Sequence, residues 1–149
     1  MVQIRQASPG DADTLVEFQI RMAEETEGLF LDRPTVTRGV QAVFGDPAKG
    51  SYWVAEEAGR IVGALLTMPE WSDWRNATVL WIHSVYVPPE ARHRGVFKAL
   101  YLHLKALVVK SADLAGLRLY VDKGNQIAQG VYTDLGMTKD HYDLYEWLR

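Results

Sequence analysis

The sequence predicts an α/β (α+β) fold, in which a mixed, mostly antiparallel sheet is flanked by helices. Apolar residues follow two periods along the chain, every second residue in some segments and every 3.6 residues in others. The predicted order of elements is β-α-α-β-β-β-α-β-α-β, and an early antiparallel hairpin argues against a purely parallel, doubly wound sheet. With 149 residues, 48% hydrophobic and 23% charged, the chain is expected to form one domain spanning residues 1–149.

The first third of the chain contains a strand and two helices. Val2–Gln6 alternates and predicts a short strand, and Ser8–Asp11 supplies turn and cap residues. An amphipathic helix is then expected to run to Glu27. A second helix is predicted over Thr35–Phe44, before the breaker Gly45–Pro47.

The middle of the chain predicts three strands. Tyr52–Glu56 and Arg60–Met68 are apolar segments separated by a tight turn, which is typical of a hairpin. Pro69–Asn76 is polar and predicts a loop. Thr78–Val87 alternates, with Val79, Trp81, His83, Val85 and Val87 expected on one face.

The last third predicts two helices and two strands. A helix is expected after Gly95, followed by a strand around Leu117–Val121 and a short helix over Asn125–Leu135. The tail, His141–Leu148, is expected to be a last strand or a hairpin arm.

The most informative segment is the turn between the Thr78–Val87 strand and the next helix. Gly95 permits a tight backbone path there, and a helix N-terminus offers free N–H groups to an anion, above all a phosphate. Arg92, Arg94 and Lys98 are expected to add phosphate contacts. Neither a Walker A loop nor a GxGxxG loop is present, which argues against a simple ATPase or dehydrogenase.

The overall composition argues against several classes of protein. A net charge of −3 is unfavourable for a nucleic-acid-binding protein. The absence of cysteine excludes disulfides, thiol nucleophiles and zinc–thiolate sites. No signal peptide, membrane span or metal-ligand spacing is visible, so a cytoplasmic protein without a metal is expected.

The segment VYVPPEARHRGVFKALY resembles the acetyl-CoA-binding motif of the GNAT N-acetyltransferase superfamily, [Q/R]-x-x-G-x-[G/A]. Arg92 and Gly95 match the motif, whereas Phe97 stands where a small residue is usual. A second segment, from Asn125 to Met137, resembles the family's NxxAxxxYxxxGF pattern. Met137 replaces its aromatic residue.

The resemblance implies a sheet splayed between its fourth and fifth strands, with the pantetheine arm of acetyl-CoA in the gap. The pyrophosphate would then lie on the turn at residues 93–98. The implied cofactor-binding residues are Val85, Tyr86, Val87, Arg92, His93, Arg94, Gly95, Val96, Phe97, Lys98 and Asn125.

Acetyl transfer to an amine requires a base for the ammonium proton, a donor for the developing oxyanion and an acid for the departing thiolate. Tyr132 resembles the family's tyrosine beside the thioester sulfur and is the predicted acid. His83 titrates in a useful range and is the predicted base. Alternatively, Tyr132 is a core aromatic residue and His83 a hydrogen-bonded core histidine.

Acidic and aromatic residues are candidates for binding the amine. The acidic residues are Glu24, Glu25 and Glu27, with Glu70 as a rival for the base; the aromatic pair is Trp71 and Trp74. Two tryptophans in a polar loop can form a wall for a cationic or apolar substrate. Alternatively, the glutamates are simply solvated and the tryptophans pack beneath the loop or at a dimer contact.

The sequence therefore predicts an N-acetyltransferase that moves the acetyl group of acetyl-CoA to a primary amine, by direct attack in a ternary complex. A small-molecule amine is the expected acceptor, and assembly as a homodimer is left open. The alternatives are a protein or peptide N-acetyltransferase and a non-catalytic acyl-CoA-binding sensor domain.

Overall fold

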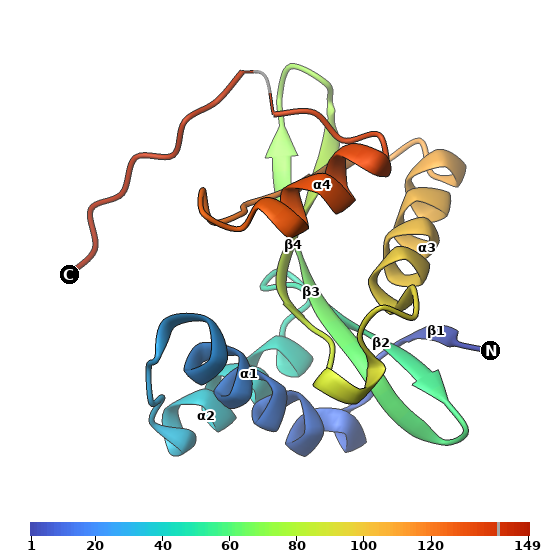
Figure 1. Cartoon of the computed structure of the whole chain (residues 1–149). Coiled ribbons are helices and arrows are strands. Elements are labelled where there is room, and N and C mark those ends of the chain that lie inside the picture. Colours follow the sequence, from blue (N-terminus) through green and yellow to red (C-terminus); the bar gives the residue numbers. More distant parts are fainter. Residues whose placement is uncertain (140) are drawn as a thin grey trace.

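The computed structural model describes residues 1–139 and 141–149 and contains a five-stranded sheet in the order β1-β2-β3-β4-β5 (Figure 1). The strands are β1 (Gln3–Gln6), β2 (Ser51–Glu57), β3 (Arg60–Ser72), β4 (Ala77–Tyr86) and β5 (Leu114–Leu119). Neighbouring strands are antiparallel except β4 and β5, which are parallel. The predicted mixed, mostly antiparallel sheet is therefore confirmed.

Helices cover both faces of this sheet. They are α1 (Ala12–Glu27), α2 (Arg33–Gly45), α3 (Val96–Lys110) and α4 (Gln126–Asp134), with short 3-10 helices at Pro9–Asp11 and Pro89–Ala91. The α2 helix begins where the Asp32 carboxylate accepts a hydrogen bond from the Thr35 N–H at 3.0 Å. The α1 helix ends at Gly28, whose φ of 63° is left-handed.

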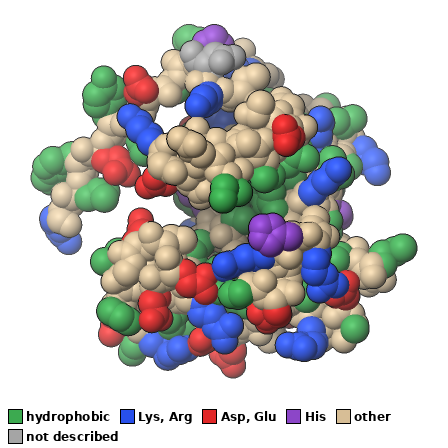
Figure 2. Space-filling view, viewed as in Figure 1, with side chains coloured by type: hydrophobic (Ala, Val, Ile, Leu, Met, Phe, Trp, Pro, Cys, Tyr) green, Lys and Arg blue, Asp and Glu red, His purple; other side chains and the backbone are tan. Residues whose placement is uncertain are grey.

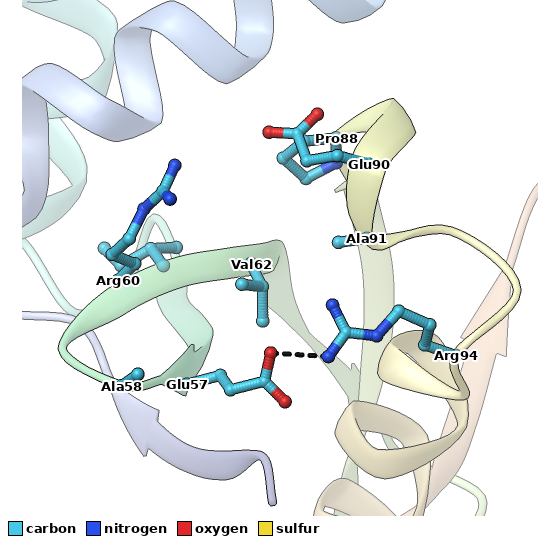
Figure 3. A pocket seen from close by; sticks show the side chains of 9 residues that line it. Glu57, Ala58, Arg60, Val62, Pro88, Glu90, Ala91 and Arg94 are labelled. Atoms are coloured by element: carbon cyan, nitrogen blue, oxygen red, sulfur yellow. Dashed lines mark hydrogen bonds and ion pairs between the residues drawn. The ribbon is translucent and has the colours of Figure 1, made fainter.

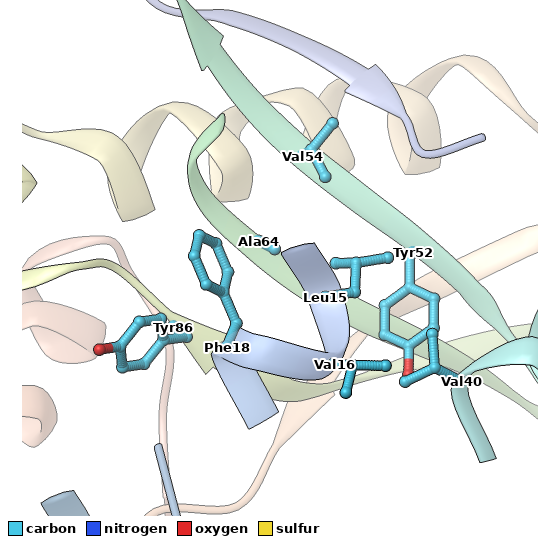
Figure 4. Close-up of a cluster of buried hydrophobic side chains, with 8 residues drawn as sticks. All are labelled: Leu15, Val16, Phe18, Val40, Tyr52, Val54, Ala64 and Tyr86. Atoms are coloured by element: carbon cyan, nitrogen blue, oxygen red, sulfur yellow. The ribbon is translucent and has the colours of Figure 1, made fainter. Parts of the chain in front are cut away.

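The first core lies between the sheet and the α1–α2 pair (Figure 4). The apolar stripe of α1 packs against β2, β3 and β4, because its apolar residues recur at helical spacing. The buried members are Leu15, Val16, Phe18, Val40, Tyr52, Val54, Ala64 and Tyr86.

The second core lies on the opposite face, beneath α3. Neighbouring strand residues divide between the two cores, because successive side chains of a strand point to opposite faces: Val54 and Ala64 belong to the first core, Ala55 and Leu65 to the second. The buried members of this second core are Ala55, Leu65, Ile82, Ala91, Val96, Leu100, Tyr101 and Leu104.

Strand β4 carries a bulge at Ser84, whose φ is 54°. His83 pairs with Leu66 and Tyr86 pairs with Ala64, so Ser84 and Val85 together oppose Leu65. Ile82 and Val85 both pack on the second core, because the extra residue shifts the alternation. The prediction that His83 shares a face with Val85 and Val87 is therefore wrong.

The sheet opens between β4 and β5. The last pair joining these strands is Ile82 with Leu119, and β4 continues to Tyr86 without a β5 partner. The predicted splay between the fourth and fifth strands is confirmed. Its open end begins beside His83 and the Ser84 bulge.

Two further predictions are corrected. Strand β3 continues to Ser72, so Trp71 lies in a strand rather than in the predicted Pro69–Asn76 loop. Pro69 is accommodated there because β2 pairing ends at Thr67, so its missing N–H removes no β2–β3 hydrogen bond. Residues 141–149 form no strand, because they pair with no other strand in the described structure.

Candidate active site

The turn before α3 presents a run of free backbone N–H groups. The Arg92 N–H donates to the Pro89 carbonyl, and the Ala99 N–H donates to the Gly95 carbonyl at 3.0 Å. The backbone N–H groups of residues 93–98, which lie between them, donate to no backbone carbonyl of the described residues. His93 and Gly95 both have left-handed backbones, with φ of 61° and 78°. Such alternation turns consecutive N–H groups toward one side and makes a concave anion site. The predicted phosphate turn thus has the donors that a pyrophosphate requires.

The two arginines of this turn are already paired with carboxylates. The Arg92 Nη2 atom donates to Glu25 at 2.6 Å, and its Nε donates to the Val87 carbonyl at 2.9 Å. Arg94 Nη2 donates to Glu57, also at 2.6 Å. Both guanidinium groups therefore brace the turn against neighbouring elements, and their predicted phosphate contacts remain predictions.

A shallow hollow of about 190 Å³ lies beside Arg94, between the β2–β3 hairpin and the 3-10 helix at Pro89–Ala91 (Figure 3). Another, of about 390 Å³, lies between α1 and the same hairpin. Neither hollow is lined by His83 or Tyr132. The first is also smaller than the roughly 300–1,000 Å³ typical of ligand pockets. The predicted acid and base therefore lie outside both hollows.

Glu25 joins the end of α1 to both β4 and the turn. It accepts hydrogen bonds from the Tyr86 hydroxyl at 2.8 Å and from Arg92. These two donors, Arg92 above all, hold the pKa of the Glu25 carboxyl below its usual value. Burial, and then the Glu25 carboxylate, raise the pKa of Tyr86. A predicted substrate-binding residue and two predicted cofactor-binding residues thus form one network.

His83 lies in an aromatic cluster at the open end of the splay. Its ring centroid is 6.2 Å from that of Trp81 and 5.6 Å from that of Tyr120. Burial lowers the pKa of His83, so its ring is neutral near pH 7 and can accept a proton. This is the protonation state that a general base requires.

Arg118 closes the cluster on the side toward β3. Its Nη1 atom donates to Glu70 at 2.7 Å, and its guanidinium carbon lies 6.0 Å from the Trp81 ring centroid. Glu70, the rival base, is thereby paired with a cation. Arg118 and Tyr120 were not predicted as site residues, because only the parallel β4–β5 register brings them beside Trp81 and His83.

Tyr132 packs against the first turn of α3. Its ring meets that of Phe97 edge-on, with centroids 5.5 Å apart, so the two motif segments touch. Burial raises the pKa of Tyr132 and keeps its hydroxyl protonated. The Asn125 side chain accepts a hydrogen bond from the Ala128 N–H at 3.1 Å and caps α4.

Trp71 and Trp74 lie at the far end of the β3–β4 hairpin and are 63% and 91% exposed. Leu66 pairs with His83, whereas Trp71 pairs with Thr78. Five residues of strand separate the two positions by roughly 17 Å, at about 3.4 Å per residue. The tryptophans are therefore not brought together with His83. Glu24 and Glu27 are exposed on the last turns of α1.

Apolar and basic side chains lie next to one another on the face of the molecule below α4 (Figure 2). Figure 2 shows hydrophobic side chains gathered in the middle of this face, below α4, with Lys, Arg and His side chains beside them. Among the described residues, no group of three or more His, Asp or Glu side chains is placed to hold a metal. None of the described helices has the length and apolar composition to cross a bilayer.

Comparison with known proteins identifies the family. Residues 15–137 match the model of the acetyltransferase (GNAT) family. A Clostridium difficile 630 protein, described as a possible acetyltransferase, is 40% identical; the match covers 100% of this chain and 98% of that one, with a TM-score of 0.93.

More distant structures share the fold. A Clostridium acetobutylicum structure, described as a predicted acetyltransferase with acetyl-CoA, is 21% identical, with 100% and 95% coverage and a TM-score of 0.72. An aminoglycoside acetyltransferase from an uncultured soil sample is 19% identical, with 99% of both chains covered and a TM-score of 0.71. No curated protein matches.

The family match covers both motif segments, the anion turn with its free N–H groups and the Tyr132 helix that packs on it. GNAT enzymes use acetyl-CoA, and the turn fits its pyrophosphate. The chain belongs to the GNAT family of acetyltransferases.

Proposed function

We propose that this protein transfers the acetyl group of acetyl-CoA to a primary amine of a small molecule, by direct attack in a ternary complex. The observation that carries the proposal is the position of His83. This half-buried histidine has a lowered pKa and lies where β4 and β5 separate. A neutral imidazole in this gap can take a proton from an amine on the acceptor side.

The cofactor is held by backbone groups. The N–H groups of residues 93–98 bind the pyrophosphate, because they have no partner within the described structure. The segment from Val85 to Val87, where β4 ends, lines the arm of the cofactor. When bound, acetyl-CoA supplies an acyl thioester, whose carbonyl carbon accepts the amine.

Two side chains handle the protons. An ammonium group with a pKa of about 10 must lose a proton before it can attack, and a ring nitrogen of His83 accepts it. The Tyr132 hydroxyl donates its proton to the departing sulfur. Burial supports this second role, because a raised pKa keeps the phenol protonated.

The acceptor side favours a compact cation. The ring of Tyr120, with its centroid 5.6 Å from that of His83, offers cation–π surface; the Trp81 ring beside it already has the Arg118 guanidinium as a partner, at 6.0 Å. Glu24 and Glu27 add negative charge at the exposed end of α1. A peptide would use a longer surface, and the exposed Trp71 and Trp74 are the residues that such an acceptor would contact.

The test is CoA release from acetyl-CoA over a panel of small amines and short lysine peptides, with Tyr132→Phe and His83→Gln variants. We expect each substitution to lower kcat by roughly 10²-fold or more, as for the loss of a general acid or base. His103→Gln is the matched control, because this histidine lies on α3 against Trp53. Full activity of Tyr132→Phe would show that Tyr132 is not the acid that protonates the departing thiolate. Binding of CoA without turnover of any amine would favour a sensor domain.

A further inference from the structure

Glu25 joins the last turn of α1 to the phosphate turn before α3. Its Oε1 atom accepts a hydrogen bond from the Tyr86 hydroxyl at 2.8 Å, and its Oε2 atom accepts one from Arg92 Nη2 at 2.6 Å. The partners lie 61 and 67 residues further along the sequence, so only the fold brings them to Glu25. Both oxygens of this carboxylate are therefore engaged within its own chain.

Arg92 is held on three sides at the start of the phosphate turn. Its Nε atom donates to the Val87 carbonyl at 2.9 Å, while Nη2 donates to Glu25. Its guanidinium carbon lies 5.8 Å from the centroid of the Tyr86 ring. Residue 92 is thus tied both to the end of β4 and to the end of α1.

The residue after Arg92 has a backbone conformation that needs such support. His93 is left-handed, with φ of 61°, which is uncommon for a residue other than glycine. Conformations of this kind persist where the surrounding structure fixes them. On its other side, Arg94 is joined to Glu57 alone, whereas Arg92 has a backbone carbonyl and a carboxylate as acceptors. Arg92 is therefore the better anchored neighbour of His93.

A buried tyrosine fixes the Glu25 carboxylate in turn. Tyr86 is 4% exposed, and its ring packs against that of Phe18 in α1, with centroids 5.0 Å apart. Figure 4 shows the Tyr86 hydroxyl pointing out of the first core, and this hydroxyl donates to Glu25. Because core packing fixes the ring, the hydroxyl determines where the carboxylate lies.

Neither charge nor stability gives Glu25 a reason to be here. A carboxylate beside an anion site repels a phosphate, so by charge alone its removal would strengthen cofactor binding. The Glu25–Arg92 pair is also partly exposed, with side-chain exposures of 37% and 42%, and such pairs contribute little to folding. What the pair does supply is a fixed position for Arg92.

We propose that Glu25 is a positioning residue for acetyl-CoA, which acts through Arg92 to keep the N–H groups of residues 93–98 directed at the pyrophosphate. Glu25 itself contacts Arg92 and Tyr86, not the cofactor. The inference rests on the proposed binding of the pyrophosphate at this turn. It assigns Glu25 to the cofactor side of the reaction, rather than to the acceptor side.

The first test is calorimetric titration of Glu25→Gln with CoA, which requires no acceptor amine. We expect the Kd to rise roughly five- to tenfold, as for coupling through an intermediate residue, with little change in the midpoint of urea unfolding. For any amine that is turned over, the KM for acetyl-CoA should rise and kcat should not fall, because the proposed acid and base are unchanged.

Glu17→Gln is the matched control for this substitution. Glu17 also lies on α1, pairs with Arg21 and Arg33, and has a side chain that is 40% exposed. Its removal should leave the CoA affinity unchanged. Unchanged or tighter CoA binding by Glu25→Gln would overturn the proposal, because repulsion between the carboxylate and the cofactor would then equal or exceed any positioning effect.

The second test is a double-mutant cycle on CoA binding with Glu25→Gln and Arg92→Gln. Because Glu25 acts through Arg92, adding Glu25→Gln to Arg92→Gln should change the Kd by less than about twofold. Full additivity would contradict the proposed route. Tyr86→Phe should weaken CoA binding by a smaller factor than Glu25→Gln, since the carboxylate keeps one of its two donors. Tyr52→Phe is its control, at an equally buried tyrosine of the same core.

A third variant separates this inference from the pyrophosphate site on which it rests. Gly95→Asp places a carboxylate at the turn in a left-handed position that aspartate tolerates, and repulsion should abolish CoA binding. Gly95→Asn has the same shape without the charge and should keep part of the affinity. Normal CoA binding by folded Gly95→Asp would refute the site and the inference together. Lost binding there, with normal binding by Glu25→Gln, would refute the inference alone.

Discussion

The ring of Phe97 meets the ring of Tyr132 edge-on, with centroids 5.5 Å apart and planes at 67°. Phe97 belongs to the first turn of α3 and Tyr132 to α4, so one contact joins the phosphate turn to the proposed acid. The family's motif usually has a small residue at this position. Here the larger ring supports the tyrosine, because edge-to-face pairs of this geometry are favourable by about 0.5–1.5 kcal/mol.

Phe97→Ala should lower the free energy of unfolding by about 1–3 kcal/mol, less than a fully buried phenylalanine because the ring is half-exposed. It should also lower kcat more than it raises KM for amines, since Tyr132 loses its support. Urea unfolding and steady-state kinetics measure the two effects. Leu102→Ala, on the exposed side of the same helix, should change neither. An unchanged kcat in Phe97→Ala would show that the contact does not position Tyr132.

The pH dependence of kcat/KM should follow the protonation of His83. Because burial lowers the pKa of this histidine, the base is neutral and active above that pKa and is lost as the pH falls through it. The acid limb should therefore have its midpoint below about 6.5. His83→Gln should abolish this limb, whereas His103→Gln should keep it. A limb that survives in His83→Gln would assign the base to another group.

Gly63→Ala should disturb the phosphate turn from the strand beneath it. A Cβ atom at residue 63 would lie 2.5 Å from Val96 Cγ1, and Val96 is the first residue of α3. We expect a loss of about 1–3 kcal/mol in unfolding free energy, as for overpacked cores, and weaker CoA binding by calorimetry. Gly39→Ala, in α2, has no atom within 4 Å of its added Cβ. It should instead stabilise the protein by about 0.5–1 kcal/mol. Normal CoA affinity in a folded Gly63→Ala protein would show that contact between residue 63 and Val96 does not affect the phosphate turn.

The Arg5–Asp11 ion pair should make stability depend on acid pH. The Arg5 hydrogen bond lowers the pKa of Asp11 from 3.8 to about 2. A depressed pKa means that the stabilisation is complete above 3.8 and is lost as the pH falls toward 2. Asp11→Asn should therefore cost about 1–2 kcal/mol at pH 7 and little near pH 2, by urea unfolding. Asp113→Asn, at an exposed carboxylate, is the matched control for removal of a negative charge. An equal cost at both pH values would contradict the linkage.

The sequence predicted best those features that depend on neighbouring residues. The turn from Arg92 to Lys98 is local, since the strand end, the glycine and the helix start lie within one short segment. The helices and the β2–β3 hairpin follow from periodicity in the same way. The Phe97–Tyr132 contact could not be predicted, because it depends on how two separate helices pack.

The missed features depend on distant partners. Nothing around Ser84 marks a bulge, since the position has neither glycine nor proline and its conformation is imposed by pairing with β3. Tyr120 joins His83 only through the parallel β4–β5 register. The tail has the alternation of a strand, but a strand also needs an edge to pair with.

The bulge at Ser84 divides β4 into two halves whose side chains are out of phase. Before it, His83 lies beside the ring of Trp81; after it, Val85 and Val87 pack on the second core, beneath α3. One inserted residue thus lets a single strand carry the aromatic cluster on one face and, two residues later, turn its next side chains to the other face. The parity of this strand, rather than the identity of any one side chain, decides which residues face each layer.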